Sequence, residues 1–392
     1  MRFRGESMKK HWHVFWTAFR LGCTSFGGPA AHIGYFHNEY VKKKQWLDEK
    51  SYADLVALAN FLPGPASSQV GIGIGTMRAG IAGGFLAWLG FTLPSVLMLS
   101  IFAMIMQTYQ LQAAGWIHSL KLIAVAVVAQ AVFEMGSKLA PDRIRQTIVL
   151  GAAAAVLSAS FVYTQIIVLL ISGIVGYIVY RKEEGEFESS AFSISKKAGS
   201  IAFLLFFGLL FLLPILRPLI ASPLFTVFDI MYRTGSLVFG GGHVVLPLLE
   251  QEIVKGGLMD KELFLAGYGL TQAVPGPLFT FSSYIGAVTH GVPGIIVATI
   301  GIFLPAFLLI IGGLSFWSAM RRNKAIRPAL LGINAGVVGI LLASLYDPIF
   351  TSTVKKPADF IFILLYFALL RIWKVPPWLI VALALIIGLV GM

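Results

Sequence analysis

The sequence predicts an all-α polytopic membrane protein with two inverted-topology repeats of broken and spanning helices. The composition predicts a membrane protein: 57% of the 392 residues are hydrophobic, only 12% are charged, and the mean hydropathy is +0.82. A soluble domain is about 25% charged. The repeats follow from a duplication, because the pattern from Phe15 to Pro94 returns from Phe228 to Pro305.

The apolar segments are numerous enough for about 10–13 transmembrane segments, if about 20 residues make one straight crossing. We expect a first repeat over residues 1–180 and a second over 221–392. Between them lie a charge-dense linker at 181–199, expected to be cytoplasmic, and one connecting transmembrane helix at 200–220.

The charges of equivalent loops predict that the repeats have opposite orientations. Residues 107–116 carry no charge, whereas the equivalent residues 318–327 carry four basic side chains. Cytoplasmic loops are enriched in Lys and Arg, so these two loops should face opposite sides. The single connecting helix supplies the inversion, and the basic N-terminus is then cytoplasmic.

The net charge of +12 is expected to face anionic lipid and the cytoplasm rather than nucleic acid. A single cysteine, Cys23, excludes an internal disulfide and a multi-cysteine metal site. The sequence has no GxxxxGK[ST] loop for ATP, no catalytic serine elbow and no HExxH motif. We therefore expect neither an enzyme nor a cofactor or metal, and transport should be driven by a gradient.

Each repeat opens with an arginine ahead of a Phe-Gly-Gly turn. The residues are Arg20, Phe26, Gly27 and Gly28 in FRLGCTSFGGPAAH, and Arg233, Phe239, Gly240 and Gly241 in FDIMYRTGSLVFGGGH. Paired glycines let the backbone unwind and present its N–H groups to a ligand. The arginine fork suits a tetrahedral oxyanion. The alternative is that both arginines extend to the lipid headgroups.

Each repeat continues with a Pro-Gly-Pro triplet inside an apolar segment, Pro63-Gly64-Pro65 and Pro275-Gly276-Pro277. Proline interrupts a helix, so each segment should consist of two short helices meeting within the membrane. The start of the second short helix offers a positive dipole end to an anion. Neutral polar side chains follow each break: Ser67, Ser68 and Gln69 in the first repeat, and Thr280, Ser282 and Ser283 in the second. The alternative is a kink that serves packing alone.

Two glutamates, Glu39 and Glu252, recur in register and are candidate coupling groups for protons or cations. The alternative is that they pair with neighbouring lysines, such as those from Lys42 to Lys44, at the membrane surface. His32 and His243 follow the glycine turns at different offsets, and we expect them to pack or to form hydrogen bonds.

The sequences FRLGCTSFGGPAAHIGYF and NFLPGPASSQVGIGIG, answered by VFGGGHVVLPLLEQE and QAVPGPLFTFSSYIG, resemble the chromate transporter (CHR) family in its long two-domain form. The resemblance covers almost the full chain. It implies a bacterial or archaeal inner-membrane protein that exports chromate and confers resistance, with sulfate as a chemically similar competitor.

The substrate and the energy source stay open at this stage. Protons or a counter-anion are the candidate coupling species, and a homodimer is an open alternative for the assembly. A sulfate or other oxyanion carrier is the alternative within the same class. An anion channel and a membrane-bound enzyme or scaffold are the alternatives from other classes.

Overall fold

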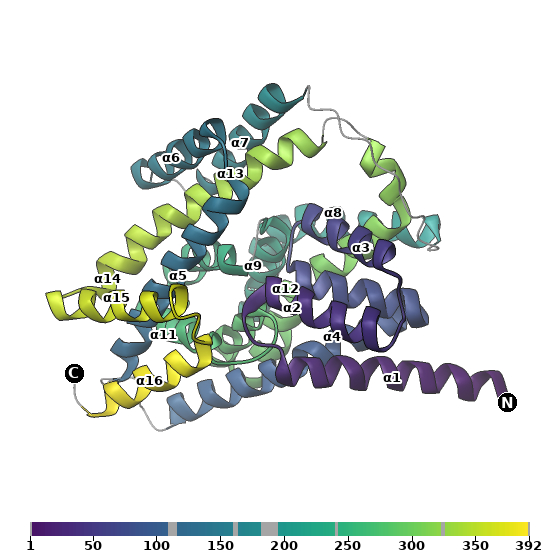
Figure 1. Ribbon diagram of the computed structural model, residues 1–392, viewed down its shortest axis with the longest axis horizontal. Coiled ribbons are helices and arrows are strands. Elements are labelled where there is room, and N and C mark those ends of the chain that lie inside the picture. Colours follow the sequence, from purple (N-terminus) through teal and green to yellow (C-terminus); the bar gives the residue numbers. More distant parts are fainter. Residues whose placement is uncertain are drawn as a thin grey trace. The chain divides into compact units, whose positions relative to one another are not determined.

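The computed structural model describes residues 2–108, 116–159, 164–181, 195–239, 242–322 and 326–390, which form only helices, turns and their connections (Figure 1). Within these residues, five helical segments are long and apolar enough to cross a membrane: Ala66–Thr108, Trp116–Leu139, Lys196–Ile220, Leu278–Trp317 and Arg327–Thr353. Two shorter apolar helices cover Thr164–Tyr180 and Pro377–Gly388. The all-α polytopic prediction is therefore confirmed, while the count of 10–13 segments stays a prediction.

The chain forms two compact units, and each unit takes segments from both sequence repeats. The first unit covers 1–105, 187–242 and 274–322. Its helices are α1 (Arg2–Thr24), α2 (Gly28–Phe36), the π-helix η1 (His37–Lys43), α3 (Glu49–Phe61), α4 (Ala66–Thr108, up to residue 105), α8 (Lys196–Ile220), α9 (Pro223–Leu237), the 3₁₀ turn η5 (Leu278–Thr280) and α12 (Phe281–Arg322).

The second unit covers 106–186, 243–273 and 323–392. Its helices are α5 (Trp116–Leu139), α6 (Arg143–Ser158), α7 (Thr164–Tyr180), η3 (Gly242–Val244, from residue 243), α10 (Val245–Leu249), the π-helix η4 (Glu250–Val254), α11 (Lys261–Thr271), α13 (Ile326–Ser344), the π-helix η6 (Leu345–Phe350), α14 (Thr351–Thr353), α15 (Pro357–Arg371) and α16 (Pro377–Val390). In this unit α13 packs against α6 and α7, and α5 packs against α11, α15 and α16 (Figure 1).

The expected helix breaks lie at the Pro-Gly-Pro triplets. Proline disfavours the helical conformation for the residue before it, and Leu62 accordingly ends α3 with extended angles (φ −81°, ψ 147°). Gly64 and Gly276 adopt left-handed conformations with φ of 112° and 102°, which only glycine tolerates without strain. Helix resumes at Ala66 in the first repeat and at Leu278 in the second.

Each long helix that follows a break bends back sharply on itself. Non-helical angles occur at Ala79 and Gly80 in α4 and at the equivalent His290 and Gly291 in α12. The two arms touch through glycines: a Cβ added to Gly75 would lie 2.5 Å from the Gly83 carbonyl oxygen. In α12, Gly286 and Gly294 make the equivalent contact. Each long helix is therefore a hairpin of two half-helices.

The first glycine turn separates α1 from α2, as the paired glycines predicted. Gly27 and Gly28 have φ of 97° and 77°. The apolar segment around them is thus two helices rather than one. In the second repeat α9 ends at Leu237, and the predicted Gly240 and Gly241 lie outside the described residues. So does most of the predicted linker, residues 182–194.

Equivalent helices of the first unit meet at equivalent glycines. A Cβ on Gly22 of α1 would lie 2.6 Å from the Phe91 carbonyl oxygen of α4. Gly235 of α9 makes the corresponding contact with Ile302 of α12. Glycine is required at these positions because any side chain would separate the helices that carry the glycine turns and proline breaks.

Candidate functional site

Inside the first unit, the proline break of each repeat contacts the residue just ahead of the Phe-Gly-Gly motif of the other repeat. The amide of Gly64 in the first break donates a hydrogen bond to the carbonyl oxygen of Val238, just ahead of Phe239, at 2.6 Å. The amide of Gly276 in the second break donates to the carbonyl oxygen of Ser25, at the start of the first glycine turn, at 2.9 Å. We call these four segments the crossed turns. Four motifs distant in sequence thus form one cluster.

A buried histidine joins the first glycine turn to the first half-helix of α4. The ring of His32 lies 3.2 Å from the Ser25 carbonyl oxygen through Nε2 and 3.3 Å from Ser67 Oγ through Nδ1. A carbonyl can only accept, so in the neutral ring Nε2 donates and Nδ1 accepts the proton of the Ser67 hydroxyl. His32 forms hydrogen bonds, as expected, and so does His243, which lies 2.6 Å from the Tyr268 hydroxyl in the second unit.

The neutral side chains beyond the first break are buried, and two of them keep atoms without a partner. Ser67, Ser68 and Gln69 are at most 2% exposed. Gln69 Nε2 donates to the Pro63 carbonyl oxygen at 2.7 Å, while Gln69 Oε1 and Ser68 Oγ have no hydrogen-bond partner among the described residues. Buried polar atoms are normally satisfied, so these atoms indicate a place where a ligand or water belongs.

At the second break, more of the polar side chains have hydrogen-bond partners. Thr280 Oγ1 donates to the Pro277 carbonyl oxygen and Ser283 Oγ to the Thr280 carbonyl oxygen, both at 2.7 Å. Ser282 is fully buried, and its hydroxyl has no partner among the described residues. The two breaks therefore share a backbone shape but differ in their free polar groups.

The first repeat arginine is bound to one of the predicted coupling glutamates. Arg20 Nη2 lies 2.5 Å from Glu39 Oε1, and Lys43 and Lys44 approach the same carboxylate at 3.8 Å. The Glu39 side chain is 6% exposed, whereas that of Arg20 is 61% exposed. Pairing of Glu39 with nearby lysines was the alternative prediction, and it is confirmed for Lys43 and Lys44.

The second repeat arginine has a different partner, which the sequence did not reveal. Arg233 donates to both oxygens of Asp229, each at 3.0 Å, and Arg217 Nη1 lies 3.4 Å from Asp229 Oδ2. Asp229 is fully buried, and the Arg233 side chain is 18% exposed. The helical spacing of Asp229 and Arg233 on α9 was a visible signal for this pair. Glu252 is half-buried in η4, the π-helix of the second repeat that corresponds to η1.

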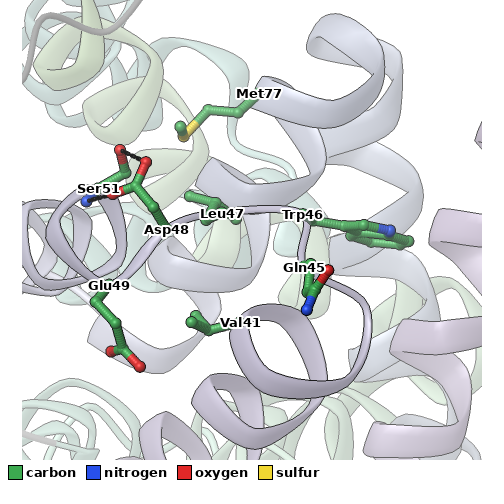
Figure 2. A pocket seen from close by; sticks show the side chains of 8 residues that line it. All are labelled: Val41, Gln45, Trp46, Leu47, Asp48, Glu49, Ser51 and Met77. Atoms are coloured by element: carbon green, nitrogen blue, oxygen red, sulfur yellow. Dashed lines mark hydrogen bonds between the residues drawn. The ribbon is translucent and has the colours of Figure 1, made fainter.

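A pocket of about 570 Å³ lies beside the loop from η1 to α3, and none of its lining residues belongs to the crossed turns (Figure 2). Asp48 caps α3 there by accepting hydrogen bonds from the Ser51 amide and hydroxyl. These bonds, that of the amide above all, hold the pKa of Asp48 below its usual value. The loop thus positions α3, and through it the first break.

Comparison with known proteins gives two matches along the chain to one family model. The family described as Chromate transporter matches residues 12–177 and 225–389. An uncharacterized transporter of Methanocaldococcus jannaschii is 30% identical over 84% of this chain and 82% of its own length. Chromate transport proteins of Pseudomonas aeruginosa and Cupriavidus metallidurans are each 27% identical, over 85% and 95% of this chain and 80% and 91% of theirs. No solved structure matches the chain.

Proposed function

The chain belongs to the chromate transporter family, and from this premise we propose that it is a secondary transporter exporting chromate across a bacterial or archaeal inner membrane. Two relatives that cover most of the chain bear the name chromate transport protein. Export of this oxyanion from the cytoplasm would confer chromate resistance. Sulfate, a tetrahedral dianion of similar shape, is the expected competitor.

The observation that carries the proposal is the reciprocal pair of hydrogen bonds at the crossed turns. The amide of Gly64 donates to Val238 and the amide of Gly276 donates to Ser25. The break of each repeat is thus hydrogen-bonded to the residue ahead of the Phe-Gly-Gly motif of the other. Reciprocal contacts of this kind are the signature of two-fold symmetry. Together with the opposite loop charges they support inverted repeats, with the N-terminus in the cytoplasm and alternating access around a central site.

The proposed oxyanion site lies at these turns. Backbone N–H groups at Gly27, Gly28, Gly240 and Gly241, and at the half-helix starts beyond Pro65 and Pro277, would face the ligand, with Phe26 and Phe239 beside them. Ser67, Gln69 and Ser282 would complete it as neutral polar contacts. Helix starts bind anions because their first N–H groups lack intrahelical partners and lie at the positive dipole end.

Arg20 and Arg233 are the proposed electrostatic anchors. Each holds a carboxylate in the structure, Glu39 and Asp229 respectively. An oxyanion has the same bidentate geometry as a carboxylate, so it can compete for the guanidinium during transport. Displacement of Glu39 from Arg20 would free its carboxylate to take up a proton, which is how we propose that it couples transport to the proton gradient. We propose the same coupling role for Glu252 in the second repeat.

The proposal is tested by uptake of labelled chromate into everted membrane vesicles, where export appears as uptake. Arg20→Gln should abolish energy-dependent uptake at unchanged protein levels. Arg233→Gln should do the same when combined with Asp229→Asn, which removes the buried carboxylate that Arg233 compensates, and excess sulfate should compete. Arg143→Gln, at the exposed start of α6, removes the same charge and should leave uptake intact. Wild-type uptake no higher than in empty vesicles would exclude chromate as the substrate.

The energy source is tested in the same vesicles. The membrane potential already favours export of an anion by about 2.3 kcal/mol per charge per 100 mV. Collapse of the potential alone, followed by collapse of the pH gradient, separates electrical driving from proton coupling. Uptake that survives both treatments and requires sulfate on the opposite side would instead identify an exchanger. Currents far above carrier turnover would identify an anion channel.

A further inference from the structure

The side-chain amide of Gln69 has a fixed orientation. Its Nε2 lies 2.7 Å from the Pro63 carbonyl oxygen, which can only accept a hydrogen bond. The amide nitrogen must therefore face Pro63, and Oε1 must face elsewhere. Because Pro63 precedes the half-helix, the side chain reaches back over the first turn and places its amide beside the proline break. A Cβ on Gly64 would lie 3.2 Å from Nε2, which confirms this position.

The other end of that amide is thus an acceptor close to a helix start, whose free N–H groups are donors. Gln69 Oε1 is fully buried and has no partner among the described residues. The half-helix that begins at Ala66 directly follows this break and has free N–H groups in its first turn, where the Ser68 hydroxyl also has no partner among the described residues. A ligand that satisfies this set accepts several hydrogen bonds and donates one.

From this donor and acceptor set we infer that the site beyond the first break takes the oxyanion in its monoprotonated form, with the ligand hydroxyl donating to Gln69 Oε1. The inference rests on the proposed function and specifies the chemical form of its substrate. A fully deprotonated tetrahedral dianion has no hydrogen to give, so it would place an oxygen against Oε1, and two acceptors in a buried site repel one another.

The second break lacks this acceptor. Counted from the Pro-Gly-Pro triplet, Phe281 stands where the first repeat has Gln69, and Thr280 stands where it has Ser68. The Thr280 hydroxyl donates to Pro277. We therefore expect the first break, and not the second, to distinguish the protonated oxyanion from the deprotonated one.

The inference predicts that sulfate and selenate compete with chromate only weakly, so that competition requires the excess of sulfate used in the vesicle assay. Chromate takes up a proton near neutral pH, whereas sulfate and selenate remain dianions unless the solution is strongly acid.

The test is counterflow exchange of labelled chromate in proteoliposomes with equal pH on both sides, at total concentrations too low for dichromate. At fixed total chromate, the rate should fall roughly tenfold for each pH unit above the chromate pKa, in step with the monoanion fraction. Selenate competes at the same sites without changing protonation. Its inhibition, measured at constant chromate monoanion concentration, should be weak and independent of pH.

Two outcomes would overturn the inference while leaving the transporter in place. One is a chromate rate that follows the dianion or the total concentration. The other is a parallel fall of chromate exchange and selenate inhibition with pH, which would mean that a protein group titrates. Absence of exchange at every pH in folded protein would overturn the proposed function as well.

A variant provides an independent readout. Gln69→Met keeps the side-chain length and removes the acceptor, so chromate exchange should become independent of pH to within roughly twofold, and selenate should compete better. The matched control is Gln165→Met in α7, where a buried glutamine also donates to a proline carbonyl, Pro247, and leaves Oε1 unpartnered among the described residues. It should keep the wild-type pH profile. If Gln69→Met does not fold, the pH dependence of chromate exchange and of selenate inhibition in the wild-type protein still tests the inference.

Discussion

Gly64 donates its amide hydrogen to the carbonyl oxygen of Val238 at 2.6 Å, and the equivalent residues of the other repeat, Gly276 and Ser25, form the same bond at 2.9 Å. These bonds use backbone groups that the proline breaks and glycine turns release from helices. Non-helical backbone within a membrane protein must be satisfied by other protein groups or by a watery cavity. Each repeat thus supplies the partner for the broken backbone of the other.

Because Gly64 has a left-handed conformation, Gly64→Ala tests whether stability and uptake depend on the backbone conformation of the crossed turns. Its φ is 112°, and a Cβ would lie 3.2 Å from Gln69 Nε2. We expect about 1–3 kcal/mol of destabilisation and loss of chromate uptake, measured by thermal unfolding in detergent and by vesicle assay. Gly34→Ala, in helical backbone with open space around it, is the control. Unchanged stability and uptake in Gly64→Ala would show that the turn is not constrained.

The hairpins of α4 and α12 depend on glycine at the contact between their arms. Gly75→Ala would place a Cβ 2.5 Å from the Gly83 carbonyl oxygen, and Gly286→Ala should act in the same way in α12. Separation of tightly packed arms costs about 1–3 kcal/mol, so both variants should melt at lower temperature. Gly208→Ala in α8 has no atom within 4 Å of the new Cβ and should not. A wild-type melting temperature in both hairpin variants would contradict the close contact.

Asp229 is expected to be essential because it compensates Arg233 and Arg217 from a fully buried position. Removal of one partner from a buried ion pair costs about 3–5 kcal/mol, so Asp229→Asn should be strongly destabilised. The double variant Asp229→Asn, Arg233→Gln should recover part of that stability. Additive losses in the double variant, measured by thermal unfolding, would mean that the two residues do not interact.

Asp142, at the start of α6 and outside the spanning segments, should make stability depend on pH in acid. Burial raises its pKa, but hydrogen bonds from the Arg145 amide and the Tyr180 hydroxyl, together with the Arg145 side chain, outweigh this and lower the pKa to about 2 from 3.8. Its contribution to stability is thus complete above pH 3.8 and is lost as the pH falls through about 2.

The check is the melting temperature of wild type and Asp142→Asn across this range. The difference between the two proteins should be greatest above pH 3.8 and should disappear below about pH 2. A difference that stays constant across the range would show that the carboxylate does not act through its charge.

Composition and the long apolar segments determined that the chain is a helical membrane protein, because 57% hydrophobic and 12% charged residues require a lipid environment and such segments cross it as helices. The duplicated motifs determined where the helices break, since proline and paired glycine act on their own local backbone. Leu62, Gly27 and Gly64 adopt the angles that these residue types demand.

Only the tertiary structure decided which partners these motifs have. Nothing local to Gly64 specifies Val238, and nothing local to Gly276 specifies Ser25, because hydrogen bonds between distant segments depend on how helices pack. The same holds for Arg20, whose contact with Glu39 is set by the course of α1 and η1. The sequence therefore determined the broken helices, and packing decided which donors, acceptors and charges they bring together.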